Sequence, residues 1–402
     1  MAEIMIIGGG ASGMAAAVRA AETAGNRVTL LERQSRVGRK LLSTGNGRCN
    51  LTNTGAGLDH YHGADTGFAA PALAAYPPEA VLRFFEGLGL KTVAEYGGRV
   101  YPMSDHAGSV LDVLRLALET RGVRIVTGAA AERVRRGKDG FTVEWAGGAS
   151  FAQKLIVACG GCAGGKLGGV KDGYQILQAL GHTRTALHPA LTPIRTAPYY
   201  PRALKGVRVD AHIALRRGST VLSEARGDVL FTETGLSGTA VFDLSRAAAT
   251  GGAGLTAALD FFPEDTEATL LADLRMRRER WPSLPANQVL TGTVHSRMGL
   301  MLCKYASLSG GTALETVPDA ALERLAAAAK DFTLPVTGVG GFEAAQVTAG
   351  GIRTAEFDPE TLESRLVPGL YACGEVLDID GDCGGYNLQW AWASGLLAGE
   401  LR

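Results

Sequence analysis

The N-terminal part of the chain alternates apolar runs with an alanine-rich segment. Glu3–Ile7 is a short apolar run, which predicts a buried strand. Ala11–Ala24 contains few helix breakers and is followed by Gly25 and Asn26, which predicts a helix that ends at the glycine. Arg27–Glu32 is again apolar and predicts a second strand. A strand, a helix and a strand within about thirty residues have the size of a parallel βαβ unit.

Periodicity along the rest of the chain predicts further helices and strands. Helical spacing occurs at Pro78–Leu88, His106–Arg121, Glu264–Trp281, Asp319–Lys330 and Leu388–Leu401. Strand-like runs occur at Val123–Val126, Ala131–Arg136, Phe141–Trp145, Phe151–Val157, Val207–Arg216, Val229–Thr232 and Gly369–Cys373. The short strands between residues 123 and 157 suggest a meander on the main sheet. A Gly- and Arg-rich stretch, Val37–Asn53, interrupts this pattern.

Composition narrows the class of protein. The 402 residues exceed what one compact core usually organises, so two or three structural units are expected. The 55 glycines stand in short clusters at segment ends, as they do where the backbone must come close to a ligand. Forty basic and forty acidic residues cancel, which argues against nucleic-acid binding and against attachment to an anionic membrane. The basic cluster Arg275–Arg280 fits a solvated helix face.

The first apolar run and the cysteines indicate the compartment in which the protein is expected. The first apolar run stops at Gly8, and neither a signal-peptide core nor an apolar run of about 18 residues follows. The six cysteines are scattered, which suits a reducing compartment. Cys159 and Cys162 form a C-x-x-C pair without a second Cys or His pair, so no metal site is expected. We therefore expect a cytoplasmic protein that does not cross a membrane.

Gly8-Gly9-Gly10-Ala11-Ser12-Gly13 matches the dinucleotide-binding pattern G-x-G-x-x-G, with a strand directly before it and a helix directly after it. Gly8 allows the tight turn, Gly10 lets the backbone approach a pyrophosphate, and Gly13 lets helix and strand pack closely. Glu32 ends the second strand, where a carboxylate accepts hydrogen bonds from an adenosine ribose and repels a 2′-phosphate. This favours FAD or NAD over NADP at this site.

The C-terminal part favours FAD over NAD. Gly369–Glu375 is a strand followed by a glycine and an acid, which is typical of the strand that brings an acid to the ribityl chain of FAD. Gly384-Gly385-Tyr386-Asn387 then opens the last helix. Its N-terminus can face the pyrimidine edge of a flavin, where negative charge collects on reduction.

Four segments carry a resemblance to one bacterial flavoprotein family, and the match spans almost the whole chain. They are Gly38–Asn53 (GRKLLSTGNGRCNLTN), Val347–Gly351 (VTAGG), Gly374–Gly395 (GEVLDIDGDCGGYNLQWAWASG) and Asp228–Gly238 (DVLFTETGLSG). The family is usually labelled NAD(P)/FAD-dependent oxidoreductase, and it includes reductases of dehydro-bile-acid enones and aminoacetone oxidases. After the strand Leu155–Ala158 this chain has Cys159-Gly160-Gly161-Cys162, where such flavoproteins commonly have Thr-Gly-Gly.

The resemblance implies an α/β fold: a Rossmann-type FAD-binding domain of the FAD/NAD(P)-binding type, with an inserted β-barrel-like and helical substrate domain. The expected division is 1–187 and 346–402 for the FAD-binding domain and 188–345 for the insertion, β-rich at 188–260 and 331–345 and helical at 261–330.

The resemblance also implies that Gly38–Asn53 wraps FAD. Arg39 and Lys40 would face the pyrophosphate or adenosine side, whereas 43–45 and 48–51 would lie along the flavin. The residues expected to contact FAD are Gly8, Gly10, Ala11, Ser12, Gly13, Glu32, Arg33, Gly38, Arg39, Lys40, Ser43, Thr44, Gly45, Arg48, Cys49, Asn50, Leu51, Ala130, Cys159, Gly160, Gly374, Glu375, Gly385, Tyr386, Asn387 and Leu388.

The catalytic groups are less well marked in the sequence. Tyr386 is the leading candidate for a proton donor, because it opens the helix that faces the flavin. Tyr101 and His106 follow as catalytic candidates, and His295 and Arg297 come after them. Cys159 and Cys162 fit either a redox disulfide or two small buried residues in a tight turn, and we favour the turn.

The sequence favours an FAD-dependent oxidoreductase that reduces the conjugated C=C of an apolar enone, such as a steroid or bile acid. No second strand–G-x-G-x-x-G–helix unit is present, so NAD(P)H is expected only as a transient electron donor, and the alternative is that the electrons come from the substrate or a partner. A small-molecule substrate is expected, and both a monomer and a homodimer are compatible with the sequence. Two alternatives stay open: an amine oxidase for an aminoacetone-like substrate with O₂ as acceptor, and a non-catalytic FAD-binding module.

Overall fold

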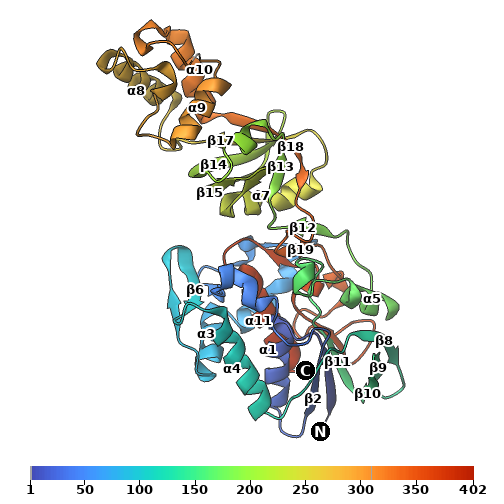
Figure 1. Ribbon diagram of the computed structural model, residues 1–402. Helices are drawn as coiled ribbons and strands as arrows, with labels where there is room; N and C mark the ends of the chain where they lie inside the picture. The colour runs from blue at the N-terminus through green and yellow to red at the C-terminus, as the bar shows by residue number, and fades with distance from the viewer. Residues whose placement is uncertain (1, 309) are drawn as a thin grey trace. The chain divides into compact units, whose positions relative to one another are not determined.

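The computed structural model describes residues 2–308 and 310–402 and divides into two compact units (Figure 1). The first unit comprises the chain up to His188 together with Ala345–Arg402, and the second comprises Pro189–Ala344. Within the first unit the two sides of the insertion are joined by a hydrogen bond from the Thr185 N–H to the Gly351 carbonyl, 2.9 Å long. The chain therefore leaves and re-enters the first unit at neighbouring points.

A five-stranded parallel sheet forms the centre of the first unit, and its strand order is β20-β11-β1-β2-β7. The central strand β1 is buried at Ile4, Met5, Ile6 and Ile7, as expected for a strand covered on both faces. The carboxyl ends of these strands meet at one edge, where ligands bind in sheets of this kind. The strands are β1 (Glu3–Ile7), β2 (Arg27–Glu32), β7 (Arg124–Thr127), β11 (Lys154–Val157) and β20 (Leu370–Ala372).

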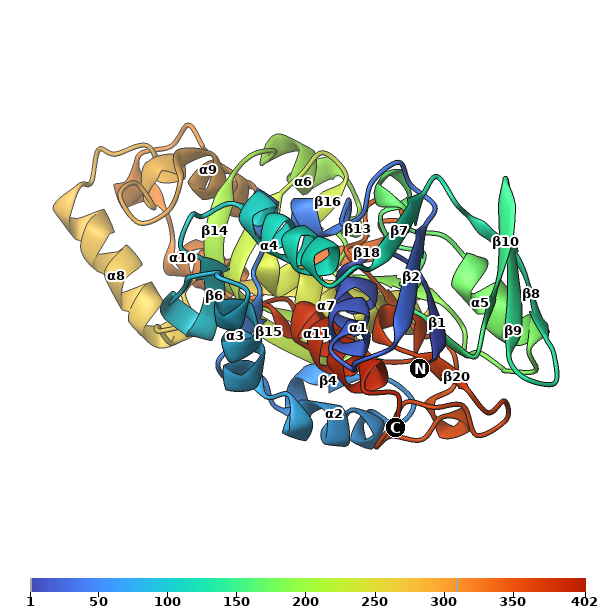
Figure 2. The same ribbon diagram turned by 90° about the horizontal axis from the view of Figure 1, so that it is seen from below.

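Two helices, α1 (Ala11–Ala21) and α11 (Tyr386–Gly399), pack together on one side of this sheet, as Figure 2 shows. Glycines bring them into close contact. A Cβ added at Gly395 would lie 2.4 Å from the Ser12 carbonyl oxygen, and one at Gly399 would lie 2.6 Å from that of Ala16. Because both contacts advance by four residues, the two helices run parallel, with Gly395 level with Ser12.

A three-stranded antiparallel meander lies on the other side of the sheet (Figure 2). It consists of β8 (Ala131–Arg136), β9 (Phe141–Trp145) and β10 (Gly148–Ala152). The predicted meander on the main sheet is present, but the run Val123–Val126 falls on β7 of the sheet itself, and the prediction of one strand at Phe151–Val157 is wrong. That run divides at Gln153, because β10 pairs antiparallel with β9 whereas β11 pairs parallel with β1.

The remaining elements of the first unit surround the sheet. The helices are α2 (Ala70–Ala75), α3 (Pro78–Gly87), α4 (Ala107–Thr120) and α5 (Asp172–Ala179). The short strands are β3 (Thr52–Asn53), β4 (Tyr61–His62), β5 (Thr92–Ala94), β6 (Arg99–Pro102) and β21 (Asp380–Gly381). Two further strands, β12 (His188–Ala190) and β19 (Val347–Ala349), lie where the chain passes between the units.

The second unit contains a closed antiparallel barrel of six strands in the order β13-β16-β15-β14-β17-β18. Its strands are β13 (Ile194–Thr196), β14 (Arg208–Arg217), β15 (Thr220–Phe231), β16 (Gly235–Ser237), β17 (Leu255–Asp260) and β18 (Phe332–Val339). The strand predicted at Val229–Thr232 is only the end of β15, whose earlier residues are mostly exposed and lack an apolar run. Helix α7 (Thr239–Thr250) packs against the barrel strands and was not predicted from the sequence.

Three helices follow the fifth barrel strand in the chain: α8 (Glu267–Arg280), α9 (Ser296–Tyr305) and α10 (Asp319–Lys330). A shorter helix, α6 (Tyr199–Ala203), precedes β14. Leu274 of α8 and Leu322 of α10 belong to the same buried core as Leu259 and Phe332 of the barrel. The helical segment and the barrel therefore form one packed unit. Within the described part of the chain, no helix has the length and apolarity needed to cross a membrane.

Candidate functional site

The turn between β1 and α1 contains glycines that the fold requires and one that it does not. Gly8 has φ +114°, and a Cβ at Gly13 would lie 1.8 Å from the Gly8 carbonyl oxygen. Gly10 has φ −82° and ψ −168°, which any residue adopts, and a Cβ there would meet no atom within 4 Å. Chain packing therefore explains Gly8 and Gly13, whereas Gly10 keeps the space in front of the α1 N-terminus open.

Glu32 closes this turn from the end of β2. Its carboxylate accepts a hydrogen bond of 2.9 Å from the Gly9 N–H and one of 2.7 Å from the Gln34 N–H. The residues that follow β7 lie close to Glu32, because the Ala129 N–H donates to the Glu32 carbonyl at 2.9 Å. The predicted contacts Glu32 and Ala130 are thus gathered beside the glycine turn.

The two helix N-termini face the same direction but do not coincide. Since Gly395 of α11 lies level with Ser12 of α1, α11 begins about eight residues, or about 12 Å, beyond the start of α1. Each N-terminus presents free N–H groups and a positive dipole end. An extended ligand that carries negative charge at two separate places fits this arrangement.

The segment Gly38–Asn53 runs between these two helix starts. It begins at the glycine turn, where the Gly38 N–H donates to the Gly9 carbonyl at 2.8 Å. It then turns sharply, since Gly45, Asn46 and Cys49 all have positive φ. At its far end a Cβ on Gly385, the N-cap of α11, would lie 2.6 Å from the Thr52 carbonyl oxygen. The segment therefore connects the two places where the sequence predicts cofactor contacts.

Three other predicted contacts of this segment, Ser43, Thr44 and Leu51, have partners within the chain. The Ser43 hydroxyl donates to the Lys40 carbonyl and the Thr44 hydroxyl donates to the Leu41 carbonyl. Leu51 is buried, and its carbonyl accepts a hydrogen bond from the Trp392 indole. These bonds fix the backbone of the segment.

Basic side chains lie at the beginning of the segment and in the residues just before it. Arg33 forms an ion pair with Asp172, and Arg39 donates to the Gln34 side chain. Lys40 Nζ lies 2.8 Å from Glu375 Oε2. These basic groups occupy the side of the site on which the sequence predicts the diphosphate.

The start of α11 contains a buried acceptor without a donor. Asn50 Oδ1 is buried, and among the described residues it finds no hydrogen-bond partner. A Cβ on Gly385 would lie 3.0 Å from this oxygen. Leu388 is partly buried in the first turn of the helix, and Asn387 holds the preceding loop through hydrogen bonds with both backbone groups of Gly381. An N–H group of a ligand at this helix start would satisfy Asn50.

The residues therefore fit FAD in two respects. Gly10 leaves open space at a helix N-terminus, which suits a diphosphate. Asn50 offers a buried, unsatisfied acceptor at the second helix N-terminus, which suits the N–H of a flavin pyrimidine ring. A dinucleotide that extended from α1 to α11 would meet both features.

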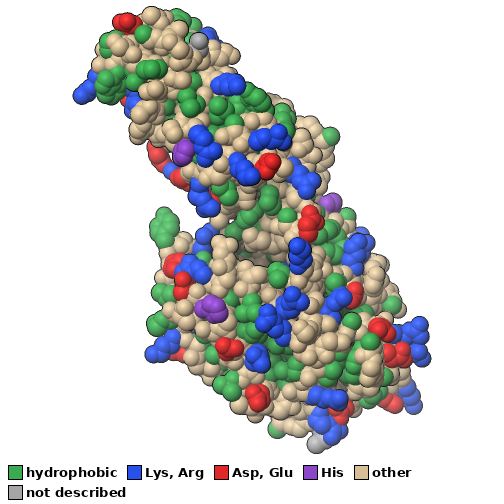
Figure 3. Space-filling model, in the orientation of Figure 1, with side chains coloured by type: hydrophobic (Ala, Val, Ile, Leu, Met, Phe, Trp, Pro, Cys, Tyr) green, Lys and Arg blue, Asp and Glu red, His purple; other side chains and the backbone are tan. Residues whose placement is uncertain are grey.

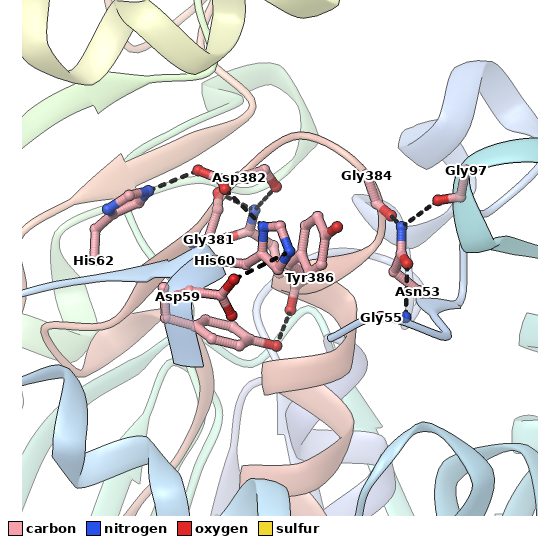
Figure 4. A network of polar contacts seen from close by, with 12 residues as sticks. Asn53, Gly55, Asp59, His60, His62, Gly97, Gly381, Asp382, Gly384 and Tyr386 are labelled. Carbon is pink, nitrogen blue, oxygen red and sulfur yellow. Dashed lines mark hydrogen bonds and ion pairs between the residues drawn. The ribbon is translucent and has the colours of Figure 1, made fainter. Parts of the chain in front are cut away.

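A cluster of aromatic and titratable residues surrounds Tyr386, the first residue of α11 (Figure 4). The Tyr386 ring stacks on the His60 ring with centroids 4.1 Å apart, and the Tyr61 ring meets it edge-on at 6.4 Å. The Tyr61 hydroxyl also donates to the Tyr386 carbonyl at 3.1 Å. These contacts fix the direction of the Tyr386 side chain.

Asp382 ties two histidines to this cluster. His60 Nδ1 lies 3.0 Å from Asp382 Oδ2, and His62 Nε2 lies 2.7 Å from Asp382 Oδ1. Burial acts to raise the pKa of Asp382, but the hydrogen bonds from the two histidines outweigh it and lower that pKa. The carboxylate is therefore ionised and holds both rings in place.

The sequence analysis missed His60, His62 and Asp382. They are brought together by the pairing of β4 with β21, two short strands far apart in the chain, in which His62 stands opposite Asp380. The only signal in the sequence is the pair of histidines on alternate positions, and that pair gives no indication of its partner.

Tyr101 and Arg48 form a separate group near the same segment. The Arg48 guanidinium lies 3.9 Å from the centre of the Tyr101 ring and forms ion pairs with Glu95 and Asp105. Burial raises the pKa of Tyr101. A Cβ on Gly45 would lie 3.4 Å from this ring. The structure therefore brings Tyr101 to the turn of the segment, with its ring face covered by Arg48.

The structure gives the remaining catalytic candidates roles at helix starts. His106 is exposed at the N-cap of α4, and its Nδ1 accepts a hydrogen bond from the Gly108 N–H. His295 caps α9 in the same way, through the Arg297 N–H, and the Arg297 side chain donates to the Lys205 carbonyl. His295 and Arg297 belong to the second unit.

The C-x-x-C pair contains two free thiols. Burial raises the pKa of Cys159 to about 12 and also raises the pKa of Cys162. Cys159 Sγ lies 3.4 Å from the Ile7 carbonyl, and a Cβ on Gly173 would come within 2.6 Å of the Cys159 Cβ. Because thiol exchange requires a thiolate, this environment favours packing in a tight turn over a redox relay. Cys49 is likewise buried, and its pKa is raised to about 12.

Comparison with known proteins places this site in context. The family model described as HI0933-like protein Rossmann domain matches residues 2–401. A Clostridium scindens protein named 3-dehydro-bile acid delta(4,6)-reductase is 40% identical and covers 100% of this chain and 98% of the relative. An Escherichia coli protein named ribosomal RNA dihydrouridine synthase is 30% identical and covers 98% of this chain and 96% of the relative.

Proposed function

Because the chain belongs to the family described as HI0933-like protein Rossmann domain, it is an FAD-dependent oxidoreductase, and we propose that it reduces a carbon–carbon double bond conjugated with a carbonyl group. The substrate proposed is a small, apolar, steroid-like enone. The observation that carries this proposal is the 40% identity, over the whole chain, with a protein named as a bile acid delta(4,6)-reductase.

The proposed reaction needs a hydride at the β-carbon of the enone and a proton at the α-carbon. Bound FAD, once reduced, supplies the hydride. The chain must orient the substrate and hold a proton donor. We assign the proton to the hydroxyl of Tyr386, whose ring is fixed between His60 and Tyr61 at the start of α11. A phenol held in one orientation is an effective general acid for carbon protonation.

The start of α11 has a second role in this proposal. Its free N–H groups and positive dipole end would stabilise negative charge on a reduced flavin bound at this terminus. Asn50, with its unsatisfied oxygen beside Gly385, would help to hold the flavin there by accepting a hydrogen bond from a ring N–H. In this proposal, electrostatic stabilisation and the proton donor belong to the same helix terminus.

We propose NADH or NADPH as the electron donor, bound only transiently. The glycine turn at Gly8–Gly13 is assigned to FAD, and no second turn of this kind occurs in the sequence. A nicotinamide that reduces the flavin would therefore enter and leave without a Rossmann domain of its own.

A second candidate is the reduction of uridine in RNA, which the 30% identical relative supports by its name. The chemistry is related, because the uracil double bond is also conjugated with a carbonyl. The charges argue for a small molecule instead. Figure 3 shows Lys and Arg side chains together with Asp and Glu side chains on the visible face of the second unit. Within this unit, Lys205, Arg208 and Arg216 form ion pairs with Glu233, Asp228 and Asp331, which lowers the positive charge available to phosphates.

Anaerobic flavin bleaching tests these proposals directly. The holoenzyme is mixed with NADH, NADPH or aminoacetone, and the loss of the yellow absorbance is followed. The reduced protein is then mixed with a 3-oxo-Δ4 steroid, with uridine, or with a ribosomal RNA transcript. Bleaching by NAD(P)H and rapid reoxidation by the steroid are expected. Reoxidation by the RNA alone would replace the substrate proposed here, and bleaching by aminoacetone alone would establish an amine oxidase. A holoenzyme that none of these compounds bleaches would contradict all three electron donors and would favour the non-catalytic FAD-binding module.

A further inference from the structure

An ion pair between Lys40 and Glu375 joins two segments that are 335 residues apart in the chain. Lys40 Nζ lies 2.8 Å from Glu375 Oε2. The other carboxylate oxygen, Oε1, accepts a hydrogen bond of 2.8 Å from the Thr348 N–H. The Glu375 side chain is 18% exposed and that of Lys40 is 32% exposed, so the pair is partly shielded from water.

The Glu375 carboxylate lies next to backbone segments that we assign to the FAD site. Gly374, its neighbour, packs against α1, because a Cβ there would lie 2.5 Å from Ser12 Oγ. A Cβ on Gly161 would lie 2.5 Å from Glu375 Oε1, and one on Gly160 would lie 4.0 Å from Oε2. Glu375 is therefore adjacent both to the start of α1 and to the glycines after β11.

The position creates an electrostatic conflict. The start of α1 suits a diphosphate, which carries two negative charges, and a carboxylate beside it repels them. An acid at this point is still useful, because it accepts hydrogen bonds from the hydroxyls of a ribityl chain. The site can use the acid only if a positive charge offsets it.

We propose that Lys40 is this offsetting charge, and that its main contribution to FAD binding is to neutralise Glu375 rather than to contact the diphosphate directly. The inference rests on the assignment of FAD to this site and is independent of the substrate. In this arrangement Lys40 keeps its ion pair with Glu375 when FAD is bound. The contribution of Lys40 to FAD affinity therefore depends on the presence of the Glu375 carboxylate.

A double-mutant cycle distinguishes the two roles of Lys40. FAD is stripped from the full-length protein, and its rebinding is followed by quenching of flavin fluorescence. We expect Lys40→Met to weaken FAD binding by at least about tenfold, because it leaves the partly shielded Glu375 carboxylate without its positive partner beside the diphosphate. We expect Lys40→Met combined with Glu375→Gln to recover most of that loss. Lys138→Met, at an exposed turn between β8 and β9, is the matched control and should leave FAD affinity unchanged.

Two results would overturn the proposal. If the double variant binds FAD as weakly as Lys40→Met, the lysine acts on the diphosphate itself. If Lys40→Met binds FAD as tightly as the native protein, the lysine has no role in affinity. Should Lys40→Met fail to fold by circular dichroism, the comparison of Glu375→Gln with the double variant carries the same test. Equal affinities of those two support charge neutralisation, and a tenfold loss in the double variant contradicts it.

Discussion

At the scale of single residues, the hydroxyl of Tyr386 is the group on which the proposed reduction depends most directly. Its ring is fixed by His60 and Tyr61, so removing the hydroxyl alone preserves the packing. We expect Tyr386→Phe to slow reoxidation of the reduced flavin by the enone by about 10²–10⁴-fold, the range for losing a general acid. Reduction by NAD(P)H should be unchanged, because that half-reaction needs no proton on the substrate. Stopped-flow absorbance measures both steps.

Tyr101→Phe is the matched control for that experiment. The Tyr101 ring lies near the same segment, but its face is covered by the Arg48 guanidinium. We expect this variant to keep the reoxidation rate of the native protein. A loss confined to Tyr101→Phe would move the proton donor from α11 to β6.

Ser364, His182 and Glu356 are hydrogen-bonded in the same series as the serine, histidine and acid of a hydrolase triad, but they cannot perform its chemistry. Ser364 Oγ lies 3.0 Å from His182 Nε2, and His182 Nδ1 lies 2.9 Å from Glu356 Oε2. The Ser364 oxygen, however, accepts hydrogen bonds from the N–H groups of Leu366 and Val367. The hydroxyl is buried and its lone pairs are occupied, so it cannot serve as a nucleophile. Their hydrogen bonds connect the loop that follows α5 with the segment that precedes β20.

This buried histidine makes stability depend on pH. Burial lowers the pKa of His182 below its ordinary value of 6.5, although Glu356 acts in the opposite direction. The unfolded chain then binds a proton more readily than the folded one. The contribution to stability is therefore complete above about pH 6.5 and is lost as the pH falls below that value.

We expect the free energy of unfolding of the native protein to decrease between about pH 7 and pH 5, and to decrease less in His182→Gln. Glutamine can bond to both Glu356 and Ser364 but does not titrate in this range. Urea unfolding at several pH values measures the difference. Equal pH slopes for the two proteins would show that His182 does not contribute.

At the scale of elements, the β1–α1 turn separates glycines required by folding from a glycine required by the ligand. We expect Gly13→Ala to destabilise the protein by about 1–3 kcal/mol or more, because its Cβ would lie 1.8 Å from the Gly8 carbonyl oxygen. Gly10→Ala should change the stability by less than about 1 kcal/mol, because its backbone angles are ordinary and its surroundings are open. FAD affinity should nevertheless fall about tenfold or more in Gly10→Ala.

Thermal unfolding of flavin-free protein and an FAD titration measure these two effects separately. Gly122→Ala offers a control at a position where a Cβ also meets no atom within 4 Å, in the turn between α4 and β7, but here φ is +69°. It should lose some stability through backbone strain and keep its affinity for FAD. Full FAD affinity in Gly10→Ala would exclude the placement of the diphosphate at α1.

The elements that the sequence predicts well are those with local signals. Helix α10 begins after Pro318 and ends at Lys330, as its periodicity indicates. The glycine turn and its helix follow from residues that are adjacent in the chain. Elements that depend on distant partners were missed. The run Phe151–Val157 looks continuous, yet its two halves join different sheets.

The candidate site shows the same limit. The glycines and Glu32 were predicted, because a strand and a helix next to them give each residue a position. The cluster of His60, His62 and Asp382 depends on the pairing of β4 with β21 and has no local signal. The Lys40–Glu375 contact similarly joins two motifs whose proximity the sequence does not state.

At the scale of the whole molecule, the residues assigned to FAD all belong to one of the two units. The glycine turn, the segment Gly38–Asn53 and the start of α11 lie in the chain up to His188 and after Ala345. The parallel sheet and both cofactor helices are likewise complete within this unit. Binding of FAD should therefore not require the insertion.

Excising the insertion tests this expectation. Thr185 and Gly351 are hydrogen-bonded, so a short Gly-Ser linker can replace Pro189–Ala344 without stretching the chain. We expect the shortened protein to fold, to bind FAD and to be yellow, because its sheet and core are intact. We also expect it to lose reoxidation by the enone, since the insertion is the proposed substrate domain. Absorbance spectra and stopped-flow reoxidation measure the two properties. If the shortened protein is folded by circular dichroism but colourless, FAD binding requires the second unit. If its enone reduction is undiminished, the first unit alone binds the substrate.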